Sequence, residues 1–253
     1  LSALSLILCV SMFVGTTYAW LSDSVTSGNN KIVAGNLNVQ LLMYEDGKGY
    51  VDIGAESEEE AKKLVSLGDR GVFDGSVTEF GDGFIKAKAL DDRVGCAALI
   101  ELLKRELPVD VCCVFTVQEE VGLRGATTAA YHVNPDLGIA VDVTGVGDVP
   151  KVGTKVPVEL GRGAAIKIMD RSLICTPSVV SMMEKLAGEN GIMVQREVLP
   201  YGGTDAGAIQ KTRCGVPSGV ISIPCRYIHS AAETVDLRDV EACIELVKAC
   251  VNK

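Results

Sequence analysis

The chain has 253 residues, which is enough for one large domain or two smaller ones and for a sizeable hydrophobic core. Hydrophobic residues make up 47% of the chain and aromatic residues only 5%, a composition that favours an α/β protein rich in small aliphatic side chains. The formal net charge is −9 and the chain has no basic block, so nucleic acid is excluded as an expected partner.

The amino-terminal segment differs from the rest of the chain. Residues 3–19 form an uncharged apolar run, which at a terminus is more typical of a signal-peptide core or a membrane-contacting segment than of a buried helix. The following residues, from Trp20-Leu-Ser-Asp23 onward, make residues 2–42 similar to the amino terminus of camelysin/TasA-type exported proteins. We therefore assign residues 1–45 to a leader with a short strand, and expect membrane association or export if it functions.

Residues 46–85 have the pattern of a small β-rich module. Residues 50–54 alternate like a short strand, and Ser57 with Glu60 has the spacing of a capping box at the start of a helix. Residues 72–73 and 84–87 read as strands on either side of a polar turn. This segment predicts a structural module without catalytic residues.

Residues 86–253 alternate between helical and strand patterns, which predicts an α/β fold with a largely parallel sheet sandwiched by helices. Helices are expected at 92–107, 126–133, 177–188, 205–211 and 237–251. Strands are expected at 109–117, 138–143, 164–168, 192–198 and 218–223. The nine cysteines have no CxxC spacing, so we expect reduced core thiols and a cytoplasmic location for this part.

The central feature is a pair of adjacent carboxylates, Glu119 and Glu120, directly after the apolar strand expected at 109–117. Two acids side by side in a poorly hydrated cleft repel each other unless a cation or a shared proton relieves them. One carboxylate would then bind metal while its neighbour moves protons. The alternative is a solvated pair at the start of a helix, where the helix dipole favours acids.

Other polar residues also follow expected strands or open expected helices, and in a parallel sheet they would meet at one edge. They are Asp91, Asp92, Glu119, Glu120, Asp142, Asp205 and His229. Carboxylates with a single imidazole form a ligand set for zinc, cobalt or manganese, and not a thiolate structural-zinc set. Asp142 could instead cap its strand, and Asp205 could cap the helix expected after it.

Five stretches occur in an order that resembles the glutamyl/deblocking aminopeptidase family, two-metal enzymes of the tetrahedral-aminopeptidase type that are sometimes described as endoglucanase-like. The stretches are Lys88–Gly95, Val117–Gly125, Ala140–Thr144, Gly202–Ala206 and Tyr227–Glu233. The resemblance covers roughly residues 46–253. It implies a zinc-exopeptidase-like catalytic domain over 86–253, lacking its amino-terminal strands. It also implies that 46–85 are the remnant of an inserted dimerisation module.

The resemblance also implies roles for individual residues. Asp91 would bridge two divalent metal ions, Glu120 and His229 would complete one site, and Asp142 would serve the other. Glu119 would be the general base acting on metal-activated water. The resemblance further implies that Asp92, which follows Asp91 across a cis peptide and orients a neighbour, is a second catalytic residue. Gly203, Thr204 and Asp205 would form the substrate-binding loop. Peptides would be the substrates and a homo-oligomer the functional form.

The chain departs from the family pattern at one metal ligand. The family has a His-x-Asp ligand motif before the inserted module, whereas the two histidines here are His132 and His229. His132 lies at an expected helix end, where a capping role fits better. We therefore expect impaired activity with only one metal retained. The alternatives are an exported surface or matrix protein, or a non-functional chimera of leader and hydrolase.

Overall fold

The computed structural model describes residues 31–34, 37–43, 49–73, 75–150 and 156–252. Within these residues the chain forms two compact units that meet in sequence between Ser76 and Val77. None of the described helices is both long enough and apolar enough to span a membrane. The apolar run at 3–19, and most of the leader that we expected over 1–45, lie outside the described residues.

The smaller unit is a four-stranded antiparallel sheet with one helix. Its strands run in the order β3-β2-β1-β4. They are β1 (Lys31–Ala34), β2 (Leu37–Met43), β3 (Gly49–Asp52) and β4 (Val72–Phe73). The sheet therefore joins residues on both sides of position 45, where we had placed a boundary between leader and module. That boundary remains a prediction.

Helix α1 (Glu58–Leu64) of the smaller unit begins where its capping residue predicts. The Ser57 hydroxyl accepts the N–H of Glu60 at 3.2 Å. The Glu60 carboxylate accepts the N–H of Glu56 at 2.9 Å, one residue before the position that a capping box uses. Acidic residues fill the first turn and lysines the last, which is the distribution that the helix dipole favours.

The larger unit is built on a mixed sheet in the order β7-β10-β8-β9. Its strands are β7 (Gly138–Gly145), β8 (Ala164–Met169), β9 (Val194–Val198) and β10 (Ser218–Cys225). The β7–β10 and β8–β9 pairs are parallel, while β8 runs antiparallel to β10. All eight residues of β10 are buried, so this strand forms the centre of the core.

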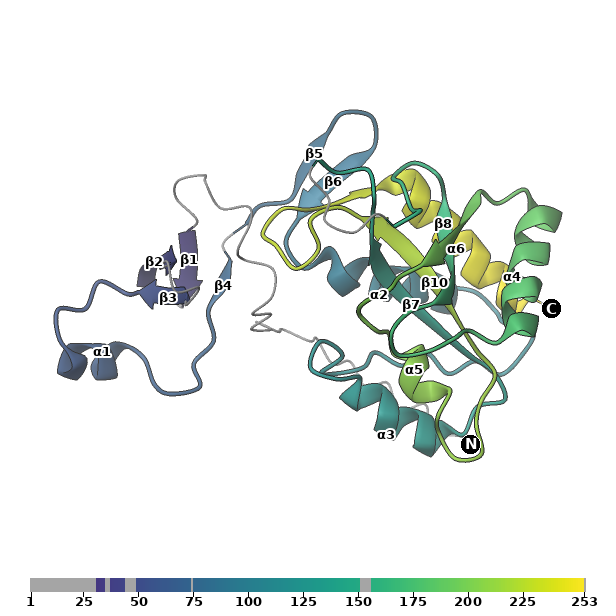
Figure 1. Ribbon diagram of the computed structural model, residues 1–253, viewed down its shortest axis with the longest axis horizontal. Helices are drawn as coiled ribbons and strands as arrows, with labels where there is room; N and C mark the ends of the chain where they lie inside the picture. Colours follow the sequence, from purple (N-terminus) through teal and green to yellow (C-terminus); the bar gives the residue numbers. More distant parts are fainter. Residues whose placement is uncertain (1–30, 35–36, 44–48, 74, 151–155, 253) are drawn as a thin grey trace. The chain divides into compact units, whose positions relative to one another are not determined.

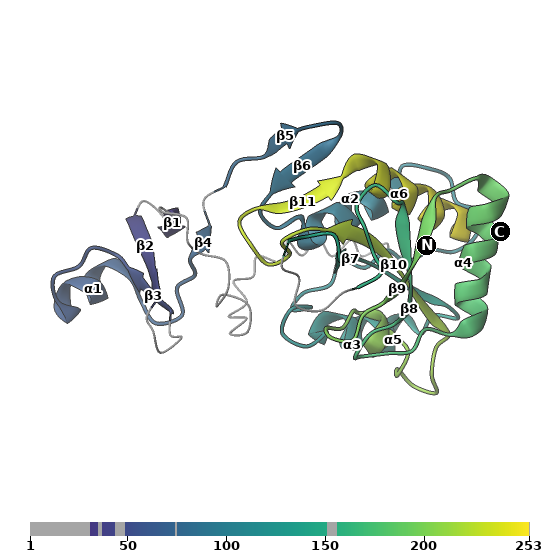
Figure 2. The ribbon, with the colours of Figure 1, turned by 45° about the horizontal axis from the view of Figure 1, so that its top comes forward.

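Helices cover both faces of this sheet, as predicted. They are α2 (Leu90–Leu103), α3 (Arg124–Val133), α4 (Pro177–Asn190), α5 (Ala206–Ile209) and α6 (Leu237–Val251). Helices α2 and α4 both pack against α6, which contacts β8 and β10. On the other face α5 lies against β7 and β10, and α3 packs against α5 (Figures 1 and 2). The predicted helices at 126–133 and 237–251 are confirmed, while α2 and α5 are shorter than expected.

A second, three-stranded antiparallel sheet lies beside the first in the larger unit. It has the order β11-β6-β5, with β5 (Thr78–Phe80), β6 (Phe84–Ala87) and β11 (Glu233–Asp236). Strand β11 was not predicted, because its Glu-Thr-Val-Asp sequence carries an acid at each end and reads as a polar loop. Its pairing with β6 places residues 233 and 87 opposite each other, so the strand before α6 is hydrogen-bonded to the strand before α2.

The expectation of a strand at 109–117 is wrong for the part of the chain that the structure describes. Burial alternates as a strand would require, since Val111 and Cys113 pack toward the core whereas Cys112 and Val114 are exposed. Residues 111–116 nevertheless form no ladder with any described strand. Side-chain alternation specifies an extended path, but a strand also needs a partner to accept its backbone hydrogen bonds.

The cysteine prediction holds only in part. No disulfide links the described cysteines, and Cys175, Cys225 and Cys243 are buried as core thiols. Cys112 and Cys214 are exposed, which corrects the expectation that all the cysteines lie in the core. Cys112 sits on the outward side of the alternating segment at 111–116, so it was misplaced together with the strand that we expected there.

Candidate metal centre

Three residues from separate segments bring their ligand atoms together in the larger unit. Asp91 lies at the start of α2, Glu120 follows the extended segment, and His229 lies in the loop between β10 and β11. The His229 Nε2 is 3.0 Å from the Asp91 Oδ2 and 3.0 Å from the Glu120 Oε2. One ligand atom from each of the three lies within 4.8 Å of the others, as a shared cation requires.

The backbone around these residues is held in an uncommon conformation. Five of the seven described non-glycine residues with left-handed φ angles lie within three positions of a candidate ligand: Ala89 at 54°, Gln118 at 60°, Leu123 at 56°, Tyr227 at 58° and His229 at 62°. Left-handed φ angles cost free energy for residues with a Cβ, and such positions concentrate at functional sites. Each of the three ligand-bearing segments contains at least one of them.

The turn that carries Glu119 and Glu120 is closed by a glycine. The Gly125 N–H donates to the Val117 carbonyl oxygen at 2.9 Å. A Cβ at position 125 would come within 2.5 Å of the Val117 nitrogen and oxygen, so no other residue fits without displacing backbone. The sequence Glu-Glu-Val-Gly-Leu-Arg-Gly therefore folds into a tight turn that orients both carboxylates.

The two adjacent glutamates have opposite pKa shifts. Burial, followed by repulsion from Glu120, Asp205 and Asp91, raises the pKa of Glu119 to about 8. Burial also acts to raise the pKa of Glu120, but the hydrogen bond and charge of His229 leave it below its usual value. Glu119 is thus a carboxyl that gains and loses a proton near neutral pH, whereas Glu120 stays ionised.

The histidine of the cluster holds a proton tightly. Hydrogen bonds to Asp91 and then to Glu120 raise the pKa of His229 to about 10. The pKa of Asp91 is raised by burial, which outweighs the lowering effect of its hydrogen bond to His229. The protonated imidazole therefore neutralises part of the charge of the two carboxylates, as a divalent cation held by these three residues would.

Two further aspartates adjoin the cluster. The pKa values of Asp92 and Asp142 are raised well above the usual value by burial, and for both the next cause is repulsion among Asp91, Asp92 and Asp142. Asp142 lies inside β7, three residues before its end, and not at the strand end that we expected. Its Oδ1 accepts the N–H of Val143 at 2.8 Å. Because β7 continues to Gly145, Asp142 does not cap the end of this strand.

Asp92 lies beside the cluster and also caps the helical part of α2. The peptide between Asp91 and Asp92 is cis, as the family resemblance implies. Both residues have non-helical angles at the start of α2. The Asp92 Oδ1 then accepts the N–H of Gly95 at 3.1 Å, which is the contact of a helix N-cap. Asp92 thereby fixes the direction in which α2 leaves the cluster.

The loop at 202–205 reaches the same region through Asp205. The Asp205 Oδ2 accepts the Thr116 hydroxyl at 2.6 Å. Asp205 occupies the N-cap position of α5, but its side chain makes no capping bond to the helix. Its buried Oδ1 has no hydrogen-bond partner in the structure. Thr204 is only 2% exposed, with its hydroxyl 3.5 Å from Asp170, so its side chain faces inward. Gly203 packs against Ser172.

A residue to which the sequence analysis assigned no role joins two of the ligand-bearing segments. Glu233, at the start of β11, accepts the N–H of Asp91 at 3.0 Å and the N–H of His229 at 2.8 Å. Burial raises its pKa to about 7. Its position at the end of the fifth family-like stretch was the available signal, but spacing alone does not show which way the side chain points.

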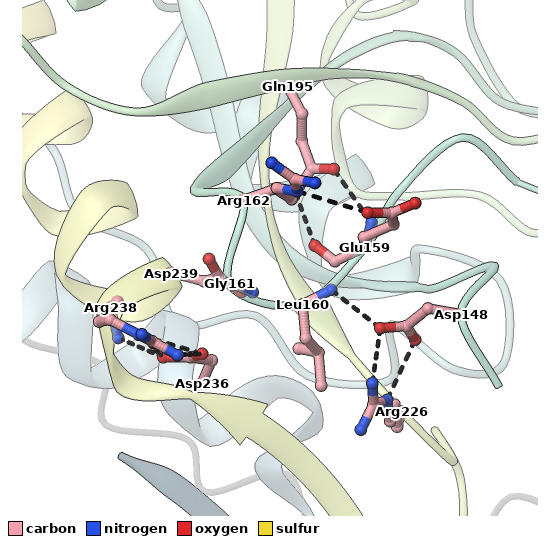
Figure 3. Close-up of polar contacts among 10 residues, drawn as sticks. All are labelled: Asp148, Glu159, Leu160, Gly161, Arg162, Gln195, Arg226, Asp236, Arg238 and Asp239. Atoms are coloured by element: carbon pink, nitrogen blue, oxygen red, sulfur yellow. Dashed lines mark hydrogen bonds and ion pairs between the residues drawn. The ribbon is translucent and has the colours of Figure 1, made fainter. Parts of the chain in front are cut away.

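His132 and two arginines near the ligand-bearing segments lie outside the cluster. His132 is exposed in the last turn of α3, in agreement with its expected place at a helix end. Arg226 forms a bidentate pair with Asp148, at 3.0 Å and 2.6 Å, and Figure 3 shows this pair below the loop that carries Leu160. Arg124 contacts Gln118 at 3.4 Å on the surface.

Comparison with known proteins gives a consistent match to peptidases. A family model described as M42 glutamyl aminopeptidase matches residues 45–246. A putative aminopeptidase of Acetivibrio thermocellus is 48% identical over 202 residues, covering 79% of this chain and 61% of that protein. The chain spans 57% to 61% of the length of four such curated relatives.

Solved structures agree with these matches. An aminopeptidase from the archaeon Desulfurococcus kamchatkensis superposes with a TM-score of 0.80 at 39% identity, covering 88% of this chain and 68% of that one. The Pyrococcus horikoshii TET1 peptidase, which assembles into a tetrahedron or a large octahedral shell, gives a TM-score of 0.74 at 33% identity, covering 89% and 72%. The α/β fold predicted from the sequence is therefore that of these peptidases.

Proposed function

This chain belongs to the M42 glutamyl aminopeptidase family, and from that premise we propose that it is the catalytic part of a metal-dependent enzyme that removes amino-terminal residues from peptides. The observation that carries this proposal is the convergence of Asp91, Glu120 and His229, whose ligand atoms lie within 4.8 Å of one another. Three ligands that leave an open position are typical of a catalytic and not a structural metal.

The donor set fits zinc, cobalt or manganese. Two carboxylates and one imidazole suit these ions, and the surrounding raised pKa values reflect buried acids without enough positive charge to neutralise them. When bound, the cation supplies Lewis-acid polarisation of the scissile carbonyl and of water. Asp91, Glu120 and His229 would hold it, and Asp92 would fix the position of Asp91 from the start of α2.

Glu119 is proposed as the general base. Its pKa of about 8 allows it to accept a proton from the attacking water and then to donate that proton to the leaving amine. Repulsion from Asp205 contributes to this pKa, which supports a place for the 202–205 loop beside the reacting groups. We propose that Gly203 and Asp205 contact the substrate, and that Thr204 does so only through its backbone.

A second cation is proposed to bind weakly in this chain. Asp91 and Asp142 supply two of its donors, while the other histidine of the sequence, His132, is exposed in α3. Two carboxylates leave most of a metal coordination sphere to water, so occupancy would need a high metal concentration. Peptide hydrolysis by this chain is accordingly proposed to be slow compared with a two-metal enzyme.

The test combines metal binding with hydrolysis. Purified chain treated with a chelator would be titrated with Co²⁺ and then assayed on aminoacyl p-nitroanilides and on the same compounds with an acetylated amino terminus. We expect cobalt binding, metal-dependent cleavage of the p-nitroanilides that have a free amino terminus, and no cleavage of the acetylated controls. Metal-independent cleavage, or equal cleavage of both substrates, would contradict an aminopeptidase that uses this centre.

A homo-oligomer is proposed as the functional form. This proposal is supported by the assembly of the TET1 peptidase, which shares the fold of 89% of this chain. Residues 46–85 are proposed to be part of the module that makes the contacts between copies. Sedimentation velocity would test this, with a species larger than the 26.7 kDa monomer as the expected result. Its loss on deletion of 46–76, the part of this segment that lies in the smaller unit, would be the check.

A further inference from the structure

Glu233 has an unusual set of partners for a buried carboxylate. Its side chain is almost fully enclosed, with the residue 2% exposed. One oxygen, Oε2, accepts the N–H of Asp91, and the other, Oε1, accepts the N–H of His229. Asp91 is 142 positions away in the sequence and His229 is 4 positions away. One carboxylate thus joins the backbones of two residues of the candidate metal centre.

These two N–H groups need an acceptor from outside their own segments. Asp91 lies at the start of α2 with non-helical angles, where N–H groups have no intrahelical partner. His229 has a left-handed φ of 62° in a loop, where no ladder bond is available to it. A buried N–H without an acceptor costs free energy, so the Glu233 carboxylate stabilises both backbone conformations at once.

The backbone of Glu233 is itself firmly held. In the β11–β6 ladder it lies opposite Ala87, four residues before Asp91. The next residue, Thr234, exchanges two backbone hydrogen bonds with Arg226 at 2.8 Å and 3.0 Å, which close the loop that contains His229. The carboxylate therefore projects from a fixed point between the two segments, and a change in its hydrogen bonding would be felt by both.

We propose that Glu233 is a positioning residue that sets the spacing of the Asp91 and His229 side chains, so that both reach one divalent cation. This inference rests on the proposed metal-dependent function and assigns Glu233 a part in it. Both oxygens of Glu233 face backbone donors, so it acts through the ligands and not as a ligand. Groups that orient metal ligands in this way affect metal affinity about 10- to 100-fold when changed.

The chain offers a matched control for the burial of a carboxylate between two N–H groups. Asp239, in α6, is also fully buried and accepts the N–H of Gly161 at 2.7 Å and of Gly163 at 2.6 Å. Figure 3 shows it beside Gly161, at a loop that contains none of the candidate ligands. Replacing Asp239 removes the same kind of contact without touching Asp91 or His229.

The experiment compares Glu233→Gln with Asp239→Asn in the full chain. A glutamine keeps the size of the side chain but turns one acceptor into a donor that faces an N–H. We expect Glu233→Gln to weaken Co²⁺ binding by about tenfold or more and to change the visible ligand-field spectrum of the bound cobalt. Asp239→Asn should lower the melting temperature while keeping cobalt affinity within about threefold of the unmodified chain and its spectrum unchanged.

A measurement without metal keeps the test independent of loading. Amide hydrogen exchange of the metal-free chain should be faster at residues 91 and 229 in Glu233→Gln and unchanged there in Asp239→Asn. If Glu233→Gln does not fold, Glu233→Asp takes its place, since the shorter side chain keeps the charge but cannot reach both N–H groups.

Three results would overturn the proposal. One is cobalt affinity and a spectrum unchanged by the substitution at 233, and another is an equal loss in the Asp239 variant. Unchanged exchange at 91 and 229 is the third. Failure of the unmodified chain to bind cobalt would instead refute the proposed function and this inference with it. A failure of the Glu233 proposal can therefore be told apart from a failure of the proposed function.

Discussion

Glu119 and Glu120 are neighbours in the chain, yet their surroundings give them opposite protonation behaviour. Glu120 faces His229 at 3.0 Å, which keeps its pKa below the usual value, whereas partial burial among other carboxylates raises the pKa of Glu119 to about 8. Environment, and not residue type, is thus what would divide the pair into the proposed ligand and the proposed base. The sequence showed that two acids were present but gave no means of telling their environments apart.

This division predicts separable effects of substitution. Glu119→Gln should lower kcat by about 10²- to 10⁴-fold, because the proton acceptor is lost, while cobalt affinity changes little. Glu120→Gln should weaken cobalt binding by more than about tenfold, because a ligand is lost. Steady-state kinetics and a Co²⁺ titration of each variant would check this. Loss of metal binding in Glu119→Gln would contradict its place as a free base.

Metal binding is predicted to depend on pH in one direction. The pKa of His229 is about 10 without metal, so at neutral pH a cation must displace its proton. Cobalt affinity should therefore rise with pH, about tenfold per unit for each proton displaced. Calorimetric titrations near pH 7.5 in buffers of different ionisation enthalpy would measure proton release, with at least about one proton expected. Constant affinity between about pH 6 and 8 would refute this.

Whereas metal affinity should rise with pH, the stability of the metal-free chain should fall. The folded-state pKa of Glu119 is raised from 4.5 to about 8, so its contribution to stability is complete below 4.5 and is lost as the pH rises through 8. Cation binding opposes this trend, because positive charge favours the ionised carboxylates. A metal-free chain should thus melt at a lower temperature at about pH 8.5 than at about pH 6, and saturating Co²⁺ should reduce the difference.

At the scale of elements, short connections place the reactive side chains more than the regular helices and strands do. The turn after Val117 is closed at Gly125, and the start of α2 is fixed by Asp92 acting as an N-cap. Helix α6 and strand β10, by contrast, supply the buried core and none of the candidate ligands. Changes in these connections should therefore affect the metal centre more than similar changes elsewhere.

Two glycine substitutions test this difference. In Gly125→Ala the added Cβ would come within 2.5 Å of Val117 backbone atoms, so we expect a loss of about 1–3 kcal/mol in stability and weaker cobalt binding. Gly188→Ala in α4 meets nothing within 4 Å and should stabilise the chain by about 0.5–1 kcal/mol without affecting the metal. Thermal unfolding and metal titration would be compared, and a neutral result at position 125 would count against the tight turn.

At the scale of the whole molecule, the three candidate ligands come from separate segments of the chain, at residues 91, 120 and 229. A cation that binds all three joins the start of α2, the turn before α3 and the loop before β11. Because the unfolded chain cannot present these ligands together, binding stabilises only the folded state. The larger unit should therefore depend on metal for part of its stability.

Cobalt at about 100 times its dissociation constant should stabilise the fold by about 2.7 kcal/mol, and a chelator should reverse the effect. Differential scanning calorimetry would measure it. Asp91→Asn should remove the metal-dependent rise in melting temperature, whereas the same substitution at the exposed Asp136 should leave it intact. A full rise in the Asp91 variant would show that cobalt binds elsewhere.

The sequence by itself determined the α/β class, most of the helices and strands of residues 86–253, and which residues could bind a metal. Hydrophobic periodicity and short motifs are local, and these features follow from local order. It did not determine the missing ladder at 111–116, the strand β11 or the partners of Glu233, each of which depends on residues distant in the chain. Only tertiary structure brings Asp91, Glu120 and His229 within reach of one cation, because chain folding alone sets the distance from His229 to two residues that lie more than 100 positions before it.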